Sequence, residues 1–283
     1  MLSYKSRTYA LCGTVRRDAR DGGELYPDAE ERRRIMDFIM AAGQTLLENG
    51  AEVFRVEQTM EIMARSFHLR EFHVYVLTNG IFASAGTAEI SEVRNVPTRT
   101  THLGRVAAVN QLSRQIAEGS VTTIDEAESR LVQARNIPFP KGRVQLLAGL
   151  SGAFCFALIF GGTLQAALVA AVAGCAANAY LLFCGRHPIG GGFRTISTAS
   201  LITILCILGC HLLHTEASHA IIGTLMILTP GIAFTMGIRD FVQGDYLSGT
   251  IRMIDALLIA ASIAIGTGLV LGAYAAWTGV VAA

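Results

Sequence analysis

The chain has 283 residues, of which 52% are hydrophobic and 16% charged, and its formal net charge is +1. Residues 1–143 hold 19 basic and 18 acidic side chains, whereas residues 144–283 hold only four of each. The second half has too little charge for a water-facing surface, so the composition excludes a single soluble domain, a disordered chain and a disulfide-stapled secreted module. The balanced charge gives no sign of a nucleic-acid-binding protein. We therefore expect a soluble head followed by a membrane domain.

Residues 1–26 are expected to form a flexible N-terminal tail, and residues 27–140 a soluble α+β cytoplasmic domain. Within that domain, apolar side chains recur at helical spacing in four segments, while aromatic and β-branched side chains gather in three short ones. The predicted helices cover residues 29–48, 52–67, 104–118 and 122–134, and the predicted strands cover residues 72–77, 80–83 and 89–96.

Capping residues mark some of these ends. Asn49-Gly50 is expected to close the first helix, because glycine readily adopts the left-handed conformation that ends helices. Thr122 or Thr123 is expected to cap the last helix together with Glu126. The domain contains no glycine-rich phosphate loop, nucleophile elbow or Cys/His metal framework, so we expect no cofactor, no metal and no enzymatic activity.

The segment from Asn49 to Glu57 stands out within this domain because charged residues follow the predicted helix cap. Glu52 with Arg55, and Glu57 with Glu61, have the spacing of neighbours on a helix. A solvated helix face explains that spacing, and a functional motif containing Arg55 and Glu57 is the alternative.

Residues 141–283 are expected to form a transmembrane domain of five helices. A bilayer core of roughly 30 Å needs about 20 apolar residues in helical form, and several of the apolar stretches contain no charge at all. The expected spans cover residues 144–160, 164–184, 196–213, 220–239 and 251–277.

The basic residues predict the orientation of these spans. If the head is cytoplasmic, all 23 Lys and Arg residues fall on the cytoplasmic side, as the positive-inside bias requires. The first 20 residues contain no apolar run long enough for a signal peptide. We therefore expect a multi-pass membrane protein, in contact with lipid, with its N-terminal domain in the cytoplasm and its C-terminus outside.

Five is an odd number of spans, and transporters are often built from two related halves. Small residues on the second and fifth spans would allow close helix contacts, either within this chain or with a partner subunit. These residues are Ala166, Ala170, Ala173, Gly174, Ala177, Gly266, Gly268 and Gly272.

The fourth span contains Pro230-Gly231, which predicts a break in the helix. A helix broken at mid-membrane exposes backbone groups and helix-end dipoles that suit a small polar substrate. A packing kink without a ligand is the alternative. Asn178, on the second span, forms either an interhelical hydrogen bond or part of the same pathway.

Four charged residues near the end of the fourth span are the other candidates for a substrate or proton pathway: Arg239, Asp240, Arg252 and Asp255. Asp255 is expected about one turn inside the fifth span, where an ionisable group is a default site hypothesis. Asp240 is expected to pair with Arg239 or Arg252 across a short inner loop. A structural ionic latch at the cytoplasmic interface is the alternative.

Two segments together resemble the threonine/serine exporter family. The first is Gly50 to Glu57, with its Arg55-Val56-Glu57 core; the second comprises Pro230-Gly231, Arg239-Asp240, Gly244-Asp245, Gly249, Arg252 and Ala256-Leu257-Leu258. The resemblance covers residues 30–275. Family residues carry over only at Glu57, Pro230, Gly231, Arg239, Asp240 and Arg252.

This resemblance implies a proton-driven exporter in the bacterial plasma (inner) membrane. Its substrates would be small polar metabolites, namely threonine- or serine-like amino acids or dicarboxylates. Because the sequence lacks a second hydrophobic module, the resemblance also implies the larger subunit of a two-component exporter. Its partner would be a small hydrophobic protein of four or five spans, and the complex is expected to be oligomeric. The alternative is a non-transporting membrane scaffold or regulator, whose cytoplasmic head senses a ligand or assembles a partner.

Overall fold

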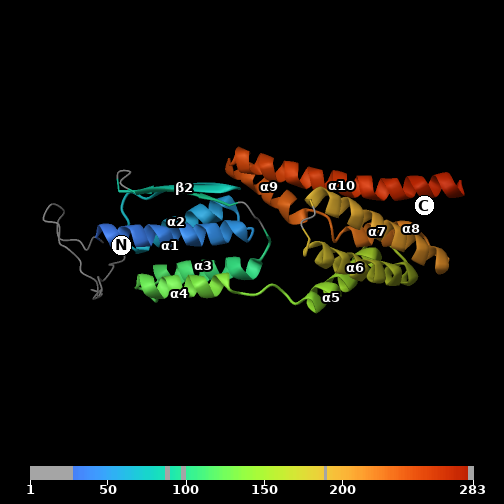
Figure 1. Ribbon diagram of the computed structural model, residues 1–283, viewed down its shortest axis with the longest axis horizontal. Helices are drawn as coiled ribbons and strands as arrows, with labels where there is room; N and C mark the ends of the chain where they lie inside the picture. Colours follow the sequence, from blue (N-terminus) through green and yellow to red (C-terminus); the bar gives the residue numbers. More distant parts are fainter. Residues whose placement is uncertain (1–27, 87–89, 97–99, 188–189, 280–283) are drawn as a thin grey trace, which may run out of the picture. The chain divides into compact units, whose positions relative to one another are not determined.

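The computed structural model describes residues 28–86, 90–96, 100–187 and 190–279. The tail expected over residues 1–26 lies outside this description. Contacts between residues divide the chain into two compact units, one of residues 1–138 with 240–248 and the other of residues 139–239 with 249–283. Figure 1 shows the elements of both units.

Among its described residues, the first unit contains four complete helices and a three-stranded sheet, together with the short segment of residues 240–248 (Figure 1). The helices are α1 (Ala29–Glu48), α2 (Val53–Ser66), α3 (Leu103–Ala117) and α4 (Ile124–Arg135); the strands are β1 (His73–Leu77), β2 (Gly80–Ala85) and β3 (Ile90–Asn95). Both strand pairs are antiparallel, in the order β1-β2-β3. The predicted helices and strands of this region are confirmed to within two residues at each end.

Local capping explains where these helices begin and end. The Asp28 carboxylate accepts a 2.8 Å hydrogen bond from the Glu31 backbone N–H and starts α1. Gly50, with a φ of +86°, ends α1 as predicted, since the Ala51 N–H reaches back to the Leu46 carbonyl. Thr123 occupies the N-cap position of α4, as predicted, with extended backbone, although its hydroxyl makes no capping hydrogen bond.

The core of the first unit lies between the helices and one face of the sheet. Helices α1 and α2 both pack on the sheet, and the side chains of Val76 and Ile81 are buried beneath them. The opposite sheet face is open. Tyr75, Phe82 and Val93 are exposed there, and the strand register aligns them in one row across the three strands.

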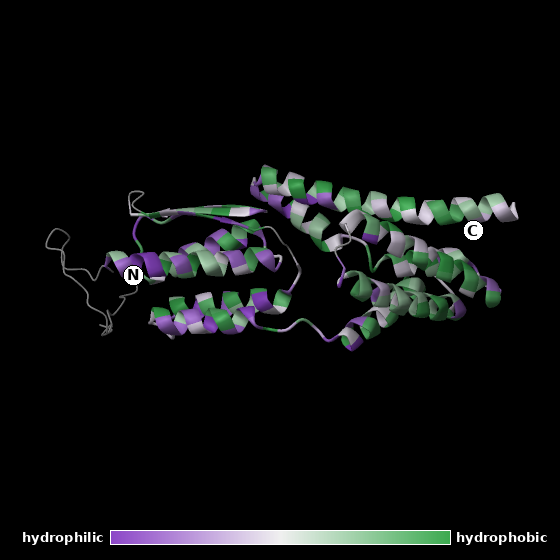
Figure 2. Cartoon of the chain, in the orientation of Figure 1, coloured by the Kyte–Doolittle hydropathy of each residue, from purple (hydrophilic) through white to green (hydrophobic). Residues whose placement is uncertain are grey.

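The second unit is entirely helical among its described residues. Its helices are α5 (Gly142–Ile159), α6 (Leu164–Cys184), α7 (Gly191–Leu212) and α8 (Ala217–Leu225), and most of α9 (Gly231–Gln243) and α10 (Tyr246–Thr278). The end of α9 and the start of α10, residues 240–248, belong to the first unit. Hydrophobic residues dominate them, whereas hydrophilic residues recur along α1 to α4 (Figure 2). Four helices, α5, α6, α7 and α10, are long and apolar enough to cross a membrane.

The fourth span, expected over residues 220–239, is interrupted next to Pro230-Gly231, where the sequence predicts a break. The structure has two shorter helices there, α8 and α9, separated by residues 226–230. Neither is long enough to cross a membrane alone, since α8 has nine residues and α9 has 13. The interruption lies where Pro230 removes a backbone donor and disfavours helix in the residue before it.

Glycines let the helices of the second unit approach closely. A Cβ on Gly174 of α6 would lie 2.5 Å from the Gly149 carbonyl oxygen of α5, and a Cβ on Gly223 of α8 would lie 2.5 Å from the Ala157 backbone nitrogen. Both distances are too short for any side chain larger than hydrogen. The small residues predicted on the second span, Ala166 to Ala177, are buried within this chain, which decides in favour of internal packing for that helix.

Contacts along the helices give their relative directions. Asn178 and Leu182, late in α6, lie against Gln145 and Gly142, early in α5, so these helices are antiparallel. Tyr180 donates a 3.0 Å hydrogen bond to Ser197, early in α7, so α6 and α7 are antiparallel as well.

Helices α7 and α10, in contrast, run parallel. Gly192 lies beside Ser262, and Ser200 donates a 3.0 Å hydrogen bond to the Gly266 carbonyl. Since α10 begins at Tyr246, its first 16 residues extend about 24 Å beyond the level at which α7 begins. We call residues 246–261 the α10 extension; it is visible in Figure 1.

Candidate functional site

The break between α8 and α9 lies inside the helical bundle. Helix α8 packs against α5, α6 and α7, and the buried Thr224 hydroxyl donates to the Ala220 carbonyl at 2.8 Å. At the end of α8, the Ile227 side chain lies 3.1 Å from the position of a Cβ on Gly174, which is the middle residue of α6. The break expected at mid-membrane is therefore found half-way along α6.

Proline and glycine shape the second side of this break. The Gly231 N–H donates to the Thr229 carbonyl at 2.9 Å, which makes a tight turn at Pro230. The Pro230 carbonyl then accepts the first hydrogen bond of α9, from the Phe234 N–H at 3.0 Å. The carbonyl groups at the end of α8 therefore lie on one side of the break and the N–H groups at the start of α9 lie on the other. The first carry partial negative charge and the second carry partial positive charge.

Helices α9 and α10 form a hairpin with a turn of only two residues. Gly244, with a φ of +91°, ends α9, and the Asp245 N–H donates to the Asp240 carbonyl at 2.9 Å. Gly237 of α9 packs against the α10 extension, since a Cβ there would lie 3.4 Å from the Gly249 carbonyl oxygen. The connection is therefore shorter than the gap from residue 240 to residue 250 that the expected spans leave.

The four predicted charged residues differ sharply in exposure. Asp240, on α9, is 0% exposed, and Arg252, on the α10 extension, is 8% exposed. The Arg252 guanidinium lies 3.3 Å from the Met236 sulfur of α9. Arg239 and Asp255 are exposed. Burial therefore separates Asp240 and Arg252 from the other two.

Asp255 is not where the sequence predicts it. It lies seven residues before Ser262, the residue beside the start of α7, and thus about 10 Å beyond that level in the α10 extension. Helix α10 begins five residues earlier than the expected span, so Asp255 is ten residues into the helix and not one turn after its start.

Asn178 makes the interhelical hydrogen bond that was one of its two predicted roles. Its side-chain N–H₂ group donates to the Gln145 carbonyl of α5 at 2.7 Å. The same side chain occupies the space beside Gly149, where even a Cβ would overlap it. Asn178 therefore holds α5 to α6.

The head motif places its two charged residues differently. Arg55 is exposed and bonds only along its own helix, to Gln58 at 3.2 Å among the contacts described. Glu57 instead accepts a 2.9 Å hydrogen bond from the Val76 N–H, which ties α2 to β1. Burial raises the pKa of the Glu57 carboxyl above its usual value, and the nearby charges of Asp245 and Glu61 raise it further.

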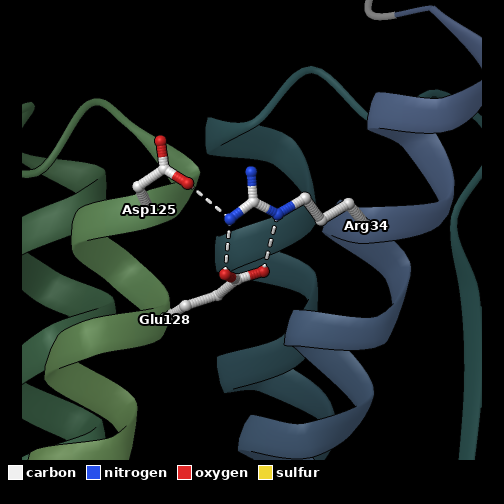
Figure 3. Close-up of polar contacts among 3 residues, drawn as sticks. All are labelled: Arg34, Asp125 and Glu128. Carbon is white, nitrogen blue, oxygen red and sulfur yellow. Dashed lines mark hydrogen bonds and ion pairs between the residues drawn. The ribbon is translucent and has the colours of Figure 1, made fainter.

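Other arginines of the first unit join its helices, and sequence spacing did not reveal them. Arg34 of α1 binds Glu128 of α4 through two hydrogen bonds, of 2.6 and 3.0 Å, and also contacts Asp125 (Figure 3). Arg135 donates a 2.7 Å hydrogen bond to the Thr45 hydroxyl, and its burial lowers the pKa of the guanidinium. The partners are some 90 residues apart in sequence, so helical spacing could not find them.

The described residues contain no group of three His, Cys, Asp or Glu side chains that could hold a metal ion. His219 and Glu216 lie 3.7 Å apart.

Comparison with known proteins identifies the family. A family model for threonine/serine exporters matches residues 37–274. The chain belongs to the threonine/serine exporter family. A protein of Mycobacterium tuberculosis named "Probable threonine/serine exporter" is 25% identical over 271 residues, which are 94% of this chain and 50% of that relative. The chain therefore spans half the length of the relative it matches, and no solved structure matches it significantly.

The exporter family match includes both motifs on which the sequence resemblance rested. It begins eight residues into α1 and ends within α10, so Arg55, Glu57 and the hairpin residues up to Asp255 all lie inside it. Membership of a membrane exporter family agrees with the four long apolar helices. The match does not assign a role to any residue.

Proposed function

We propose that this chain is a subunit of a secondary exporter in the bacterial plasma membrane, and that the helix break between α8 and α9 is part of its pathway. The proposed substrates are threonine- or serine-like amino acids, with dicarboxylates as the related class, and the proposed driving force is the proton gradient. The observation that carries this proposal is a helix interrupted half-way along α6 in a chain of the exporter family.

The break suits a zwitterionic amino acid because of its two helix ends. The N–H groups at the start of α9 attract a carboxylate, and the carbonyl groups at the end of α8 attract an ammonium group. Irregular backbone is tolerated at membrane depth only where protein covers it or a water-filled cavity adjoins it. A substrate path beside residues 226–230 supplies such a place.

The directions of the helices support a five-crossing topology. Because α7 and α10 run parallel, the chain must return across the bundle between them. Only α8 and α9 connect these helices, so the broken pair takes the place of the fourth span. Under this proposal, the first domain is cytoplasmic and the C-terminus lies outside.

We assign the coupling role to Asp240 rather than to Asp255. Asp255 is exposed in this structure, so a proton bound there exchanges directly with the surroundings without any change of conformation. Asp240 is withdrawn from water in this state, and it lies on the helix that begins at the break. Arg252, on α10, is also buried.

The partner subunit is part of the same proposal. The matched relative is twice the length covered here, and α10 exposes the small residues Ala264, Gly268, Gly272 and Ala276 at four-residue spacing. Such a face allows close helix approach in lipid. We propose that a small hydrophobic subunit of four or five spans packs there in an oligomeric complex.

Efflux from intact cells tests the transport proposal. Cells that lack this chain should retain more intracellular threonine and serine after loading with dipeptides, and the wild-type chain should restore efflux. Asp240→Asn should fail to restore it, whereas the matched control Asp255→Asn should succeed. Full restoration by Asp240→Asn would refute the coupling role.

A second measurement separates transport from the alternative role as a scaffold. Proteoliposomes that contain this chain and its partner subunit should accumulate or release labelled threonine when a pH gradient is imposed. Absence of flux with both subunits present would favour a scaffold or regulator and would overturn the exporter proposal.

A further inference from the structure

One end of the second unit gathers basic side chains from three helices. Lys141 and Arg143 stand at the start of α5, Arg186 follows the end of α6, and Arg194 lies in the first turn of α7. All four are exposed. We call these four residues the basic end.

The helices bring these residues to the same end of the bundle although they span 54 positions in sequence. A Cβ on Gly142 would lie 3.6 Å from the Leu182 side chain, so the start of α5 adjoins the last turn of α6. The 3.0 Å hydrogen bond from Tyr180 to Ser197 likewise joins the last turns of α6 to the first turns of α7. The arrangement depends on packing within this unit alone.

The basic end is not balanced by acidic residues of the same helices. No Asp or Glu occurs between residues 139 and 215, and the loops at the opposite end of α5 to α7, residues 160–163 and 213–216, contain no Lys or Arg. The first acidic residue of α10 on this side, Asp255, lies about 10 Å along the helix from the level of α7's start. Two helix N-terminal ends, those of α5 and α7, add to the positive potential.

Helix length places these cations at the depth of lipid headgroups. Helix α6 has 21 residues and is about 31 Å long, which matches the hydrocarbon core of a bilayer. Arg186 follows its last turn by two residues, and the aromatic ring of Phe183 lies 4.9 Å from that of His187 at the same end. The phosphate oxygens of a headgroup are the anions available at this depth, and guanidinium groups bind them well.

We propose that the basic end is a binding site for the phosphate group of anionic phospholipids. Zwitterionic phospholipid carries the same phosphate but also an ammonium group, which the four cations repel. The site therefore selects for lipids with net negative charge, such as phosphatidylglycerol, independently of whether the chain transports a substrate.

Lipid retention by the purified full-length protein tests this site. The protein is placed in mixed micelles with equal mole fractions of phosphatidylglycerol and phosphatidylcholine, and the bound lipids are counted by native mass spectrometry. Wild-type protein should retain phosphatidylglycerol in preference. Arg186→Gln with Arg194→Gln should weaken that retention by about fivefold per charge removed, or about 25-fold together.

Matched variants keep the result interpretable. Arg33→Gln with Arg114→Gln removes the same charge from exposed positions on α1 and α3 and should leave retention unchanged. Arg186→Lys with Arg194→Lys keeps the charge and should keep most of the preference, which separates lost attraction from lost folding. Equal retention of the two lipids by wild-type protein, or equal loss in the α1/α3 control, would overturn the proposal.

A competition arm distinguishes lipid from soluble phosphate. Inorganic phosphate added at the same concentration of phosphorus should not displace phosphatidylglycerol, because only the lipid is anchored at the depth of the cations. If inorganic phosphate displaced labelled phosphatidylglycerol from the wild-type protein as effectively as unlabelled phosphatidylglycerol does, the site would bind a soluble anion and the lipid proposal would be refuted.

Discussion

Replacing Gly266 with alanine tests the contact on which the parallel packing of α7 and α10 depends. A Cβ on Gly266 would overlap the Ile196 carbonyl oxygen and would lie 3.0 Å from the Ala199 Cβ. Neither neighbour can turn away, since one is backbone and the other is the first atom of a side chain. The helices must therefore move apart by roughly 1 Å to restore ordinary carbon–oxygen spacing.

The expected loss of stability has two parts. Inserting a methyl group into a close-packed contact costs about 1–3 kcal/mol. Separating the helices also weakens the hydrogen bond from Ser200 to the Gly266 carbonyl, which is worth about 0.6 kcal/mol in membrane proteins. Alanine favours helix over glycine by up to about 1 kcal/mol, which offsets part of this. We expect Gly266→Ala to destabilise the protein by about 1–2 kcal/mol.

Unfolding by sodium dodecyl sulfate in mixed micelles measures this free energy, and Gly268→Ala is the matched control. Gly268 is exposed, and a Cβ there would have no neighbouring atom within 4 Å. The control should therefore be neutral or slightly stabilising through helix propensity. Equal stability of the two variants would show that α7 and α10 do not approach as described, and the level assigned to the α10 extension would be wrong.

Three further predictions concern single contacts. Burial raises the pKa of the Glu57 carboxyl, so the folded protein loses stability as the pH rises from the ordinary pKa of this group to its raised pKa. Glu57→Gln should therefore increase the free energy of unfolding at neutral pH and flatten its dependence on pH. The glutamine side-chain oxygen can still accept the hydrogen bond from the Val76 N–H. Arg34→Ala should cost less than about 1 kcal/mol and less still in high salt, because its ion pairs are exposed; thermal unfolding at two ionic strengths checks this. Asn178→Ala should lower the free energy of unfolding in detergent by about 0.6 kcal/mol, because it removes the hydrogen bond to the Gln145 carbonyl. Efflux should remain intact. Abolished efflux in a folded variant would instead place Asn178 on the substrate pathway.

The sequence determines the secondary structure of this protein closely because its signals are local. Asp28 and Gly50 bound α1 through hydrogen bonds to residues within one turn, so their effect does not depend on the rest of the fold. Hydropathy likewise identifies the apolar helices, since 21 consecutive residues of α6 contain no charge. Pro230 marks the broken helix for the same local reason.

The candidate site was less predictable, and the two aspartates show why. Asp240 and Asp255 look alike in sequence, as single acidic residues near the ends of apolar stretches. In the structure Asp240 is fully buried and Asp255 is exposed. Burial depends on which helix face meets a neighbouring element, and the position of that neighbour is set by the fold and is not written in the residues around each aspartate.

The level of α10 along α7 was likewise decided by tertiary structure alone. The α10 extension continues into the rest of α10 with no change in hydropathy that marks the boundary, since Leu257 and Leu258 precede the level of Ser262. Only the contacts of Gly192, Ser200 and Gly266 fix that level.

The uneven distribution of charged residues between the two halves of the sequence was enough to predict a polar half and a membrane half. Composition has no direction or depth, however, because it records which residues are present and not which ones meet. Helix packing through glycine contacts decided that α7 and α10 run parallel, and that four basic residues from three helices share one end of the bundle. Such contacts join residues tens of positions apart, which is why sequence periodicity did not reveal them.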